Sequence, residues 1–392
     1  MAEREYDIVL FGATGFTGGL TAEYLARAAG AGGIDTRWAL AGRNQAKLEA
    51  VRERLADGHA DLALLIADAT EPASLRAIAE SAKVVITTVG PYIHYGEPLV
   101  AACAAAGTDY VDLTGEPEFV DLMWLRYHEQ AERTGARIVH CCGFDSIPHD
   151  LGVLYTVNHL PEDEPLKVEG FVRAGGTFSG GTYHTAVHNM GRLYKSRQVA
   201  AQRRRLEGRP DGRSIRGITG LPHHDETANG WVLPMPTVDP QVVLTSARTL
   251  PRYGPKFSYG HYLVSKRLAT LGGLTAGVGA LVALAQLPPT RNLLLKFRDP
   301  GDGPTAEQRQ TAWFKVTFKG TTPSGDRVVT EVRGGDPGYG ETSKMLGEAA
   351  LCLAHDDLPQ RAGQLTPAVA MGQALIDRLT RAGISFSVRD QL

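Results

Sequence analysis

Residues 6–18 constrain the fold of this chain more than any other segment. The apolar run Tyr6–Phe11 predicts a short strand, and the glycine-rich stretch Gly12-Ala-Thr-Gly15-Phe-Thr-Gly18 follows it directly. Apolar residues then recur with helical spacing from Phe16 to Ala29. A strand, a glycine-rich turn and a helix in this order predict the first unit of a Rossmann domain, in which a dinucleotide binds at the turn.

Each glycine of this turn has its own physical role. Gly12 permits the tight turn, Gly15 lets a pyrophosphate approach the backbone, and Gly18 lets the helix pack closely on the strand. The N–H groups and the positive dipole at the start of the helix also favour phosphate. A glycine turn in another kind of α/β protein is the alternative interpretation. The residues expected to contact the dinucleotide here are Gly12, Thr14, Gly15, Phe16, Thr17 and Gly18.

Strand and helix patterns alternate as far as residue 142. After the first strand and helix, the expected strands are 37–41, 61–67, 83–89, 109–113 and 137–142, and the expected helices are 45–55, 71–81, 96–106 and 118–134. Six short apolar strands separated by helices predict a parallel sheet that is covered on both faces. We therefore expect an α/β fold with a doubly wound Rossmann domain over residues 1–150.

The pattern changes after Pro148. The expected strands are 166–173, 313–319 and 327–333, and the expected helices are 342–353 and 367–382. The second and third of these strands are expected to pair across the turn-rich stretch 321–326. These features predict an α+β substrate domain over residues 151–340. The C-terminal helices, within residues 341–392, are expected to pack back on the Rossmann domain.

The residues after the second expected strand indicate which dinucleotide binds. Enzymes that use NAD usually place an acidic side chain there for the ribose 2′-hydroxyl, whereas this chain has Gly42-Arg43-Asn44. An arginine suits the 2′-phosphate of NADP(H), because its guanidinium donates charge-assisted hydrogen bonds in a fork. Asn44 and Lys47 are expected to assist. The alternative is that Arg43 caps a solvated helix start.

Two further strand ends are expected to reach the dinucleotide. Asp68 follows the third strand, where its side chain either contacts the adenine amino group or caps the helix that starts near Glu71. Val89-Gly90-Pro91 ends the fourth strand, at the edge of the crevice where the strand order reverses and where the nicotinamide is expected.

Seven stretches spread over the chain carry a family resemblance. They are GATGFTG (12–18), LAGRN (40–44), TVGPYIHYGEPLVAACAAAGTDYVDLTGE (88–116), CCGFDSIPHDLG (141–152), GDGPTAEQRQTAWFKVTFKG (301–320), GGDPGYGETSKMLGEAALCLA (334–354) and LTPAVAMGQALIDRL (365–379). Through them the chain resembles the saccharopine dehydrogenase-like oxidoreductases, and more closely their actinobacterial trans-acting enoyl reductases. The resemblance implies an NADP-binding Rossmann domain, a substrate domain inserted before C-terminal helices, and a reductase of lipid-like acyl chains that a polyketide synthase or acyl carrier presents. The chain shows no amino-acid carboxylate clamp that matches true saccharopine reductases, which argues against saccharopine-type chemistry.

Reduction of an enoyl thioester requires a hydride from the cofactor, an electrophilic donor at the carbonyl and a proton source. Three segments that end at the carboxyl edge of the sheet offer polar side chains: Tyr92, His94 and Tyr95, then Thr114 and Glu116, then Asp145, Ser146 and His149. The candidate proton donors among them are Tyr92, His94, Glu116 and Asp145. Tyr92 follows Gly90-Pro91 and either donates a proton or packs as a wall against the nicotinamide. The alternative for His94 is a surface histidine, and for Asp145 a cap of the helix that Pro148 starts.

Composition narrows the classes of function. The formal net charge is −2, so the chain as a whole has no electrostatic attraction for nucleic acid. The four cysteines form no CxxC pair and the start of the chain shows no signal-peptide pattern, which predicts a cytoplasmic protein with reduced thiols.

His184 and His188 have the spacing of metal ligands but lack a third ligand, so no metal is expected. The loop 177–182 either meets a substrate phosphate or carbonyl or caps a helix.

Two segments indicate partners. Residues 191–216 hold nine Lys and Arg against two acidic residues, which predicts either a solvated element or a docking surface for an acidic carrier or anionic lipid headgroups. Residues 268–290 carry no charge and are flanked by Lys266-Arg267 and Arg291. Their length would permit a membrane span, but four glycines favour a buried element or an interfacial one that touches an acyl chain or a membrane.

The sequence leaves three functions open. The favoured one is an NADPH-dependent reductase of an acyl substrate, an enoyl thioester presented by a carrier or synthase. The second is an amino-acid or imine oxidoreductase of the saccharopine dehydrogenase type. The third is a non-catalytic, NADP-binding scaffold that associates with lipid or membrane, and the uncharged segment 268–290 is the feature that favours it.

Overall fold

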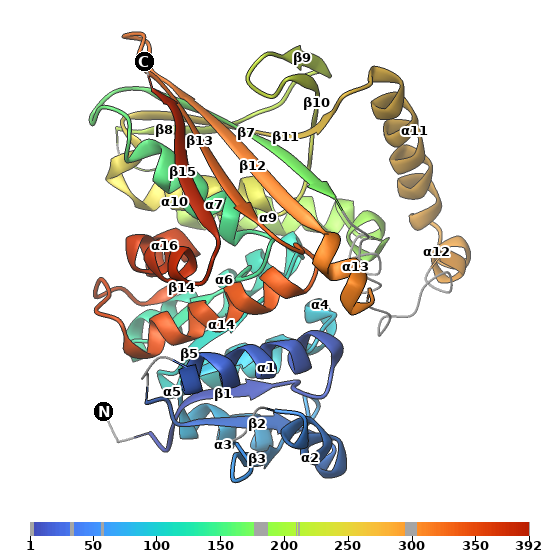
Figure 1. The fold of residues 1–392 in the computed structure, drawn as a ribbon, viewed down its shortest axis with the longest axis vertical. Helices are drawn as coiled ribbons and strands as arrows, with labels where there is room; N and C mark the ends of the chain where they lie inside the picture. Colours follow the sequence, from blue (N-terminus) through green and yellow to red (C-terminus); the bar gives the residue numbers. More distant parts are fainter. Residues whose placement is uncertain are drawn as a thin grey trace. The chain divides into compact units, whose positions relative to one another are not determined.

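The computed structural model describes residues 4–31, 35–55, 59–175, 187–208, 210, 212–294 and 304–391. The chain divides into two compact units (Figure 1). The first consists of Met1–Phe144 and Tyr339–Arg378, and the second of Asp145–Gly338 and Leu379–Leu392. Each unit is built on its own sheet.

The first unit contains a seven-stranded sheet in the order β14-β6-β5-β4-β1-β2-β3, in which every pairing is parallel. Its strands are β1 (Tyr6–Phe11), β2 (Trp38–Gly42), β3 (Ala63–Ile66), β4 (Ala82–Thr87), β5 (Asp109–Asp112), β6 (Arg137–Val139) and β14 (Gly363–Leu365). This order confirms the expected doubly wound Rossmann fold, with the strand order reversing between β1 and β4. The seventh strand comes from the C-terminal part of the chain and was not predicted.

Two groups of helices cover this sheet. One group comprises α3 (Pro72–Ser81), α5 (Glu97–Ala106) and α6 (Pro117–Thr134), and the other includes α1 (Phe16–Ala31) and α14 (Gly340–His355), which pack on each other. Val9, Phe11 and Val85 share a core cluster with residues of the first group. The alternate residues Ile8 and Leu10 are equally buried, as expected for a parallel sheet covered on both faces. The remaining helices of the unit are α2 (Gln45–Glu53), α4 (Tyr92–Tyr95) and α15 (Pro367–Ala370).

The structure corrects the expected C-terminal elements. The single helix expected at 367–382 is two helices, α15 and α16 (Gly372–Arg381), because Gly372 takes a positive φ of 49° that interrupts helical geometry. A strand that was not predicted, β15 (Ser385–Gln391), follows and pairs with the second sheet. The fourth strand, expected to reach residue 89, ends at Thr87, where the chain leaves the sheet.

The second unit contains a mixed eight-stranded sheet in the order β15-β13-β12-β7-β11-β10-β9, with β8 also paired to β11. Its other strands are β7 (Leu166–Gly175), β8 (Ser214–Ile218), β9 (His223–Asp225), β10 (Gly230–Pro234), β11 (Lys256–Ser265), β12 (Trp313–Thr321) and β13 (Arg327–Gly334). The pairing of β12 with β13 confirms the expected hairpin. Together with its helices, this sheet confirms the expected α+β character of the second region.

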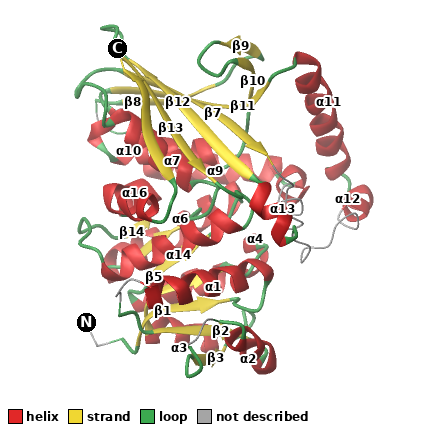
Figure 2. Cartoon of the chain, viewed as in Figure 1, coloured by secondary structure: helices red, strands yellow, loops and turns green. Residues whose placement is uncertain are grey.

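Helices of the second unit pack on one face of its sheet (Figure 2). These helices are α7 (Ile147–Val157) and α10 (Asp239–Thr249). The unit also contains α9 (Leu193–Glu207), the short helix η1 (Pro251–Tyr253), α11 (Leu268–Ala285), α12 (Pro288–Leu294) and α13 (Ala306–Thr311). Alternate residues of β12, among them Val316 and Phe318, are buried. Gly152 of α7 lies so close to Phe318 that a Cβ atom on it would be 2.3 Å from the phenyl ring.

Gly152→Ala tests the packing of α7 on the second sheet. Alanine is the better helix former by about 1 kcal/mol, but its methyl group would overlap the buried Phe318 ring. We expect packing to outweigh helix propensity and the free energy of unfolding, measured in urea, to fall by about 1–3 kcal/mol. The matched control is Gly220→Ala, whose methyl group would meet no atom within 4 Å. An unchanged or higher stability of the Gly152 variant would contradict this packing.

Candidate functional site

The glycine-rich loop lies at the switch point of the first sheet, between the ends of β1 and β4. Gly12 has a φ of 91°, and its carbonyl oxygen accepts hydrogen bonds from the Gly15 N–H (3.0 Å) and the Thr88 hydroxyl (3.1 Å). Its own N–H donates to Ala41 of β2 (3.0 Å). The loop is therefore fixed to three neighbouring strands before any ligand binds.

The three glycines differ in how much space surrounds them. A Cβ atom on Gly18 would lie 2.1 Å from the Gly12 carbonyl oxygen, so only glycine allows α1 to start this close to β1. A Cβ atom on Gly15 would meet only that oxygen, at 3.5 Å, and Thr14, Gly15 and Phe16 are exposed. An exposed glycine at a helix start leaves the backbone open to a pyrophosphate, as the fold requires of a dinucleotide site. Thr17 is half-buried beside them.

The end of β2 carries an exposed arginine. Arg43 is followed by Asn44, whose side-chain oxygen accepts the Lys47 N–H (3.0 Å) and thereby caps α2. Asn44 rather than Arg43 therefore caps this helix, which leaves the Arg43 guanidinium available to a phosphate. Asp68, after β3, accepts hydrogen bonds from the Thr70 N–H and hydroxyl, and these bonds with the nearby Arg43 charge lower its pKa. The N-cap of α3 is Glu71, so the alternative in which Asp68 caps that helix does not hold.

The start of α14 packs beside the glycine-rich loop within the first unit. The Phe16 ring meets the Tyr339 ring edge to face, with centroids 4.6 Å apart, and the Ser343 hydroxyl lies 3.5 Å from the Thr17 carbonyl oxygen. The Thr342 hydroxyl accepts the Phe144 N–H (3.0 Å). Sequence analysis did not include Tyr339, Thr342 or Ser343 in the site, although the glycines and the polar residues at this helix start were a usable signal.

Tyr92 and Glu116 hold the turn that follows β4. The two carboxylate oxygens of Glu116 accept the N–H groups of Tyr92 and Ile93, each at 2.8 Å, and the Tyr92 hydroxyl donates to the Thr87 carbonyl (3.0 Å). Burial raises the pKa of Tyr92 well above 10, and burial, partly offset by the two N–H bonds, also raises the pKa of Glu116. Both side chains are buried and committed to backbone groups. They therefore position the segment that contains Val89, Gly90 and Pro91.

A buried pair missed by sequence analysis lies at the ends of β5 and β6. The Asp112 carboxylate accepts the Tyr110 hydroxyl (2.9 Å) and the Cys141 N–H (3.1 Å), and lies 2.7 Å from Nδ1 of His140. Nε2 of His140 has no hydrogen-bond partner within the described part of the chain. Both residues follow the strand-end rule that selected Glu116, so position alone was a usable signal for them. His94, by contrast, is exposed and its ring contacts Tyr95.

A second polar cluster lies within the second unit. The Asp239 carboxylate, at the start of α10, lies 3.3 Å from Nε2 of His261 on β11 and 3.7 Å from Nε2 of His149 on α7. The Tyr259 hydroxyl lies 2.9 Å from the other ring nitrogen of His261. The ligand atoms of the three side chains lie within 4.8 Å of one another, close enough to share a cation. Sequence analysis singled out His149 but missed Asp239 and His261, because the three residues are far apart in the chain.

Asp145 lies beside this cluster at the start of the second unit. Loss of hydration and the nearby Asp239 charge raise the pKa of Asp145 to about 8. Burial lowers the pKa of His149 to about 4 against the opposing effect of Asp239. Burial alone would raise the pKa of Asp239, but the two imidazoles hold it below its usual value. Burial and the Asp239 charge therefore favour the protonated form of Asp145, whereas the two imidazoles favour the ionised form of Asp239. The side chain of Ser146 makes no capping hydrogen bond at the start of α7.

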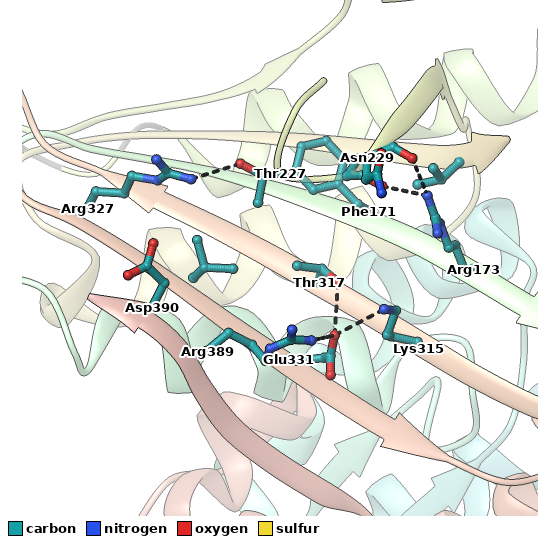
Figure 3. A pocket seen from close by; sticks show the side chains of 13 residues that line it. Phe171, Arg173, Thr227, Asn229, Lys315, Thr317, Arg327, Glu331, Arg389 and Asp390 are labelled. Atoms are coloured by element: carbon teal, nitrogen blue, oxygen red, sulfur yellow. Dashed lines mark hydrogen bonds and ion pairs between the residues drawn. The ribbon is translucent and has the colours of Figure 1, made fainter. Parts of the chain in front are cut away.

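A pocket of about 370 Å³ lies on the face of the second sheet (Figure 3). Glu331 of β13 pairs there with Lys315 (3.3 Å) and Arg389 (3.0 Å), from the two neighbouring strands. Arg173 donates to the backbone of Asn229 (2.9 Å). The charged lining of this pocket suits a polar ligand group better than an acyl chain. The loop 177–182 and His184 lie outside the described residues.

Comparison with known proteins agrees with this geometry. Residues 8–139 match the family described as the saccharopine dehydrogenase NADP binding domain. A candidate trans-acting enoyl reductase of Mycobacterium tuberculosis is 42% identical, over 97% of both chains. The trans-acting enoyl reductase of Mycobacterium ulcerans is 36% identical, over 98% of both chains.

A solved structure shares the fold of the whole chain. The apo saccharopine dehydrogenase (L-glutamate forming) of Saccharomyces cerevisiae superposes with a TM-score of 0.53, over 99% of this chain and 100% of that one. Its sequence identity is 11%, so this likeness concerns the fold alone. It agrees with a parallel Rossmann sheet followed by a second, mixed sheet.

Gly15→Ala and Gly18→Ala separate nucleotide binding from folding of the loop. A methyl group at Gly15 fits the structure, so this variant should keep its melting temperature but bind NADPH at least about tenfold more weakly (about 1.4 kcal/mol). A methyl group at Gly18 overlaps the Gly12 carbonyl, so that variant should lose both thermal stability and affinity. Calorimetric titration and thermal unfolding measure the two effects. Wild-type affinity of the Gly15 variant would contradict the assignment of the loop.

Asp145→Asn tests the raised pKa of Asp145. Between about pH 4 and pH 8 the unfolded chain has lost the Asp145 proton while the folded chain keeps it, so this group makes stability fall as pH rises through that window. The variant lacks this contribution. We expect the urea-derived stability of the wild type to fall more than that of the variant between pH 5 and pH 8, by at least about 1.4 kcal/mol, the equivalent of one pKa unit. Parallel pH profiles would show that the pKa is ordinary.

Proposed function

This chain belongs to the saccharopine dehydrogenase-like oxidoreductases, in the family of the mycobacterial trans-acting enoyl reductases, and we propose that it reduces the carbon–carbon double bond of an acyl thioester with NADPH. The observation that carries this proposal is the likeness over 97% of both chains to a candidate enoyl reductase. The open glycine-rich loop at the switch point supports it, because that loop is where a nicotinamide dinucleotide binds in this fold.

The chain itself supplies binding and orientation for this reaction. The backbone at Gly12–Gly18 and the start of α1 bind the pyrophosphate, and Arg43 binds the 2′-phosphate. The Val89-Gly90-Pro91 segment, held by Tyr92 and Glu116, would contact the nicotinamide of a bound NADPH. NADPH, when bound, supplies the hydride.

Asp145 is the proton donor that we assign. Among the four candidates, Tyr92 and Glu116 are committed to backbone groups, whereas burial and the Asp239 charge raise the pKa of Asp145 and favour its protonated form. A carboxylic acid whose pKa lies near the working pH is well suited to general acid catalysis. We assign His94, which is exposed, no step.

The acyl substrate is proposed to arrive on a polyketide synthase or an acyl carrier. The relatives are named trans-acting enoyl reductases, and an enzyme that acts in trans takes its substrate from a separate protein. Helix α9 supplies a suitable surface, because Arg197, Arg204 and Arg205 are exposed on it. An acidic carrier domain would be attracted to these charges.

Turnover with enoyl thioesters tests the proposed activity. Short- and long-chain enoyl thioesters of coenzyme A are offered with NADPH, whose absorbance is followed. We expect NADPH oxidation, and a fall in kcat of about 10²–10⁴-fold in Asp145→Asn with unchanged NADPH affinity. His94→Gln is the matched control and should keep its activity. Turnover only with an amino acid and a keto acid would select saccharopine-type chemistry, and NADPH binding without any turnover would favour a scaffold.

Arg43→Ala tests the cofactor preference. Because the guanidinium is expected to pair with the 2′-phosphate, wild-type protein should bind NADPH more than about tenfold more tightly than NADH. The variant should lose that difference while binding NADH unchanged, as measured by fluorescence titration of both nucleotides. Arg76→Ala, at an exposed arginine of α3, is the control. Retained preference in the Arg43 variant would show that another group reads the phosphate.

A further inference from the structure

Helix α11 presents an apolar surface whose exposure to water is unfavourable. Leu268–Ala285 has 18 residues and a mean hydropathy of 1.9, and by length and composition it is the kind of helix that can cross a membrane. Only 12% of it is buried, which excludes the alternative of a buried core helix. Exposed residues follow one another without a break from Thr275 to Ala280, so the exposure runs round the helix and is not a single stripe.

Three polar side chains of α11 and the residues that follow it already have hydrogen-bond partners within the protein. The Thr275 hydroxyl donates to the Leu271 carbonyl (2.7 Å), and the Thr290 hydroxyl donates to the Leu287 carbonyl (3.0 Å). The Gln286 amide donates to the Met190 carbonyl (2.6 Å). Groups with internal partners do not need water, so these three side chains tolerate a hydrocarbon environment.

Both ends of α11 are attached to the same unit. Near its start, Leu271 is 2% exposed and the helix contacts β10 and β11. At its end, Ala285 packs with Val187 and Leu294. The helix is about 27 Å long, close to the thickness of a hydrocarbon core. If it crossed a bilayer, its two ends would lie on opposite sides, which is incompatible with their attachment to one folded unit.

Cationic side chains flank the apolar surface. Lys266 and Arg267 are exposed directly before α11, and Arg291 lies in α12. The large apolar side chains Leu287 and Leu293 are 60% and 59% exposed beside Arg291. Apolar groups bordered by Lys and Arg match the acyl boundary and anionic headgroups of a lipid surface, and the two attractions together give stable peripheral binding.

We propose that α11 and α12 form a peripheral membrane-docking element that binds anionic lipid surfaces without crossing the bilayer. A second copy of this chain is a weaker explanation, because one partner helix would cover a single stripe of α11. The proposal concerns where the protein works, and it holds or fails independently of the reaction that it catalyses.

Co-sedimentation of the full chain with phosphatidylcholine vesicles, with and without phosphatidylglycerol, tests this proposal. We expect binding to the anionic vesicles that weakens in high salt. Val278→Glu combined with Leu284→Glu should reduce the partition coefficient by at least about tenfold, because charges would replace exposed apolar groups. Leu221→Glu is the matched control, since Leu221 is 84% exposed but lies outside the element. NADPH binding and melting temperature report that each variant is folded.

Four further outcomes decide the proposal. Lys266→Glu combined with Arg267→Glu should abolish the preference for phosphatidylglycerol. Alkaline carbonate should release the bound protein, and resistance to it would overturn the peripheral geometry in favour of a span. Absence of binding to either vesicle would overturn the proposal, as would a lipid-free dimer that Val278→Glu with Leu284→Glu converts to monomer.

Discussion

The contact between Gly18 and the Gly12 carbonyl is the constraint on which the nucleotide-binding unit depends. A single added methyl group would come within 2.1 Å of that oxygen, so the close approach of α1 to β1 exists only because residue 18 has no side chain. The same carbonyl accepts the Thr88 hydroxyl and thereby joins the end of β4 to the loop. The start of α14 then packs on the loop through Tyr339 and Phe16.

Much of the first unit was predictable, because its information is local. Buried parallel strands read as short apolar runs, and the glycine spacing specifies the turn. The missed parts depend on partners far apart in the chain. Strands β14 and β15 are short or end-of-chain segments whose pairing is decided by the sheets that receive them, and Gly372 divides a helix that periodicity alone extends across it.

The candidate site was predictable in position and only partly in role. The strand-end rule placed Tyr92, Glu116 and the glycine loop correctly at the carboxyl edge of the sheet, but composition does not reveal that Glu116 accepts two backbone N–H groups. The grouping of His149, Asp239 and His261 could not be predicted, because the three residues come from α7, α10 and β11, which are far apart in the chain. The raised pKa of Asp145 depends on burial and on the Asp239 charge, and both are properties of the fold.

The proposed enzyme combines a unit that binds NADPH with a second unit that presents an uncharged, exposed helix. A lipid-like acyl substrate would explain why the two features occur in one protein, because such chains partition to lipid surfaces. The central claim is hydride transfer to an acyl chain, and isotope transfer tests it most directly. With NADPH deuterated at nicotinamide C4 on the transferred face and an enoyl thioester as substrate, mass spectrometry should find one deuterium in the acyl chain of the saturated product. NADPH oxidation that leaves the thioester unsaturated and unlabelled would contradict the account.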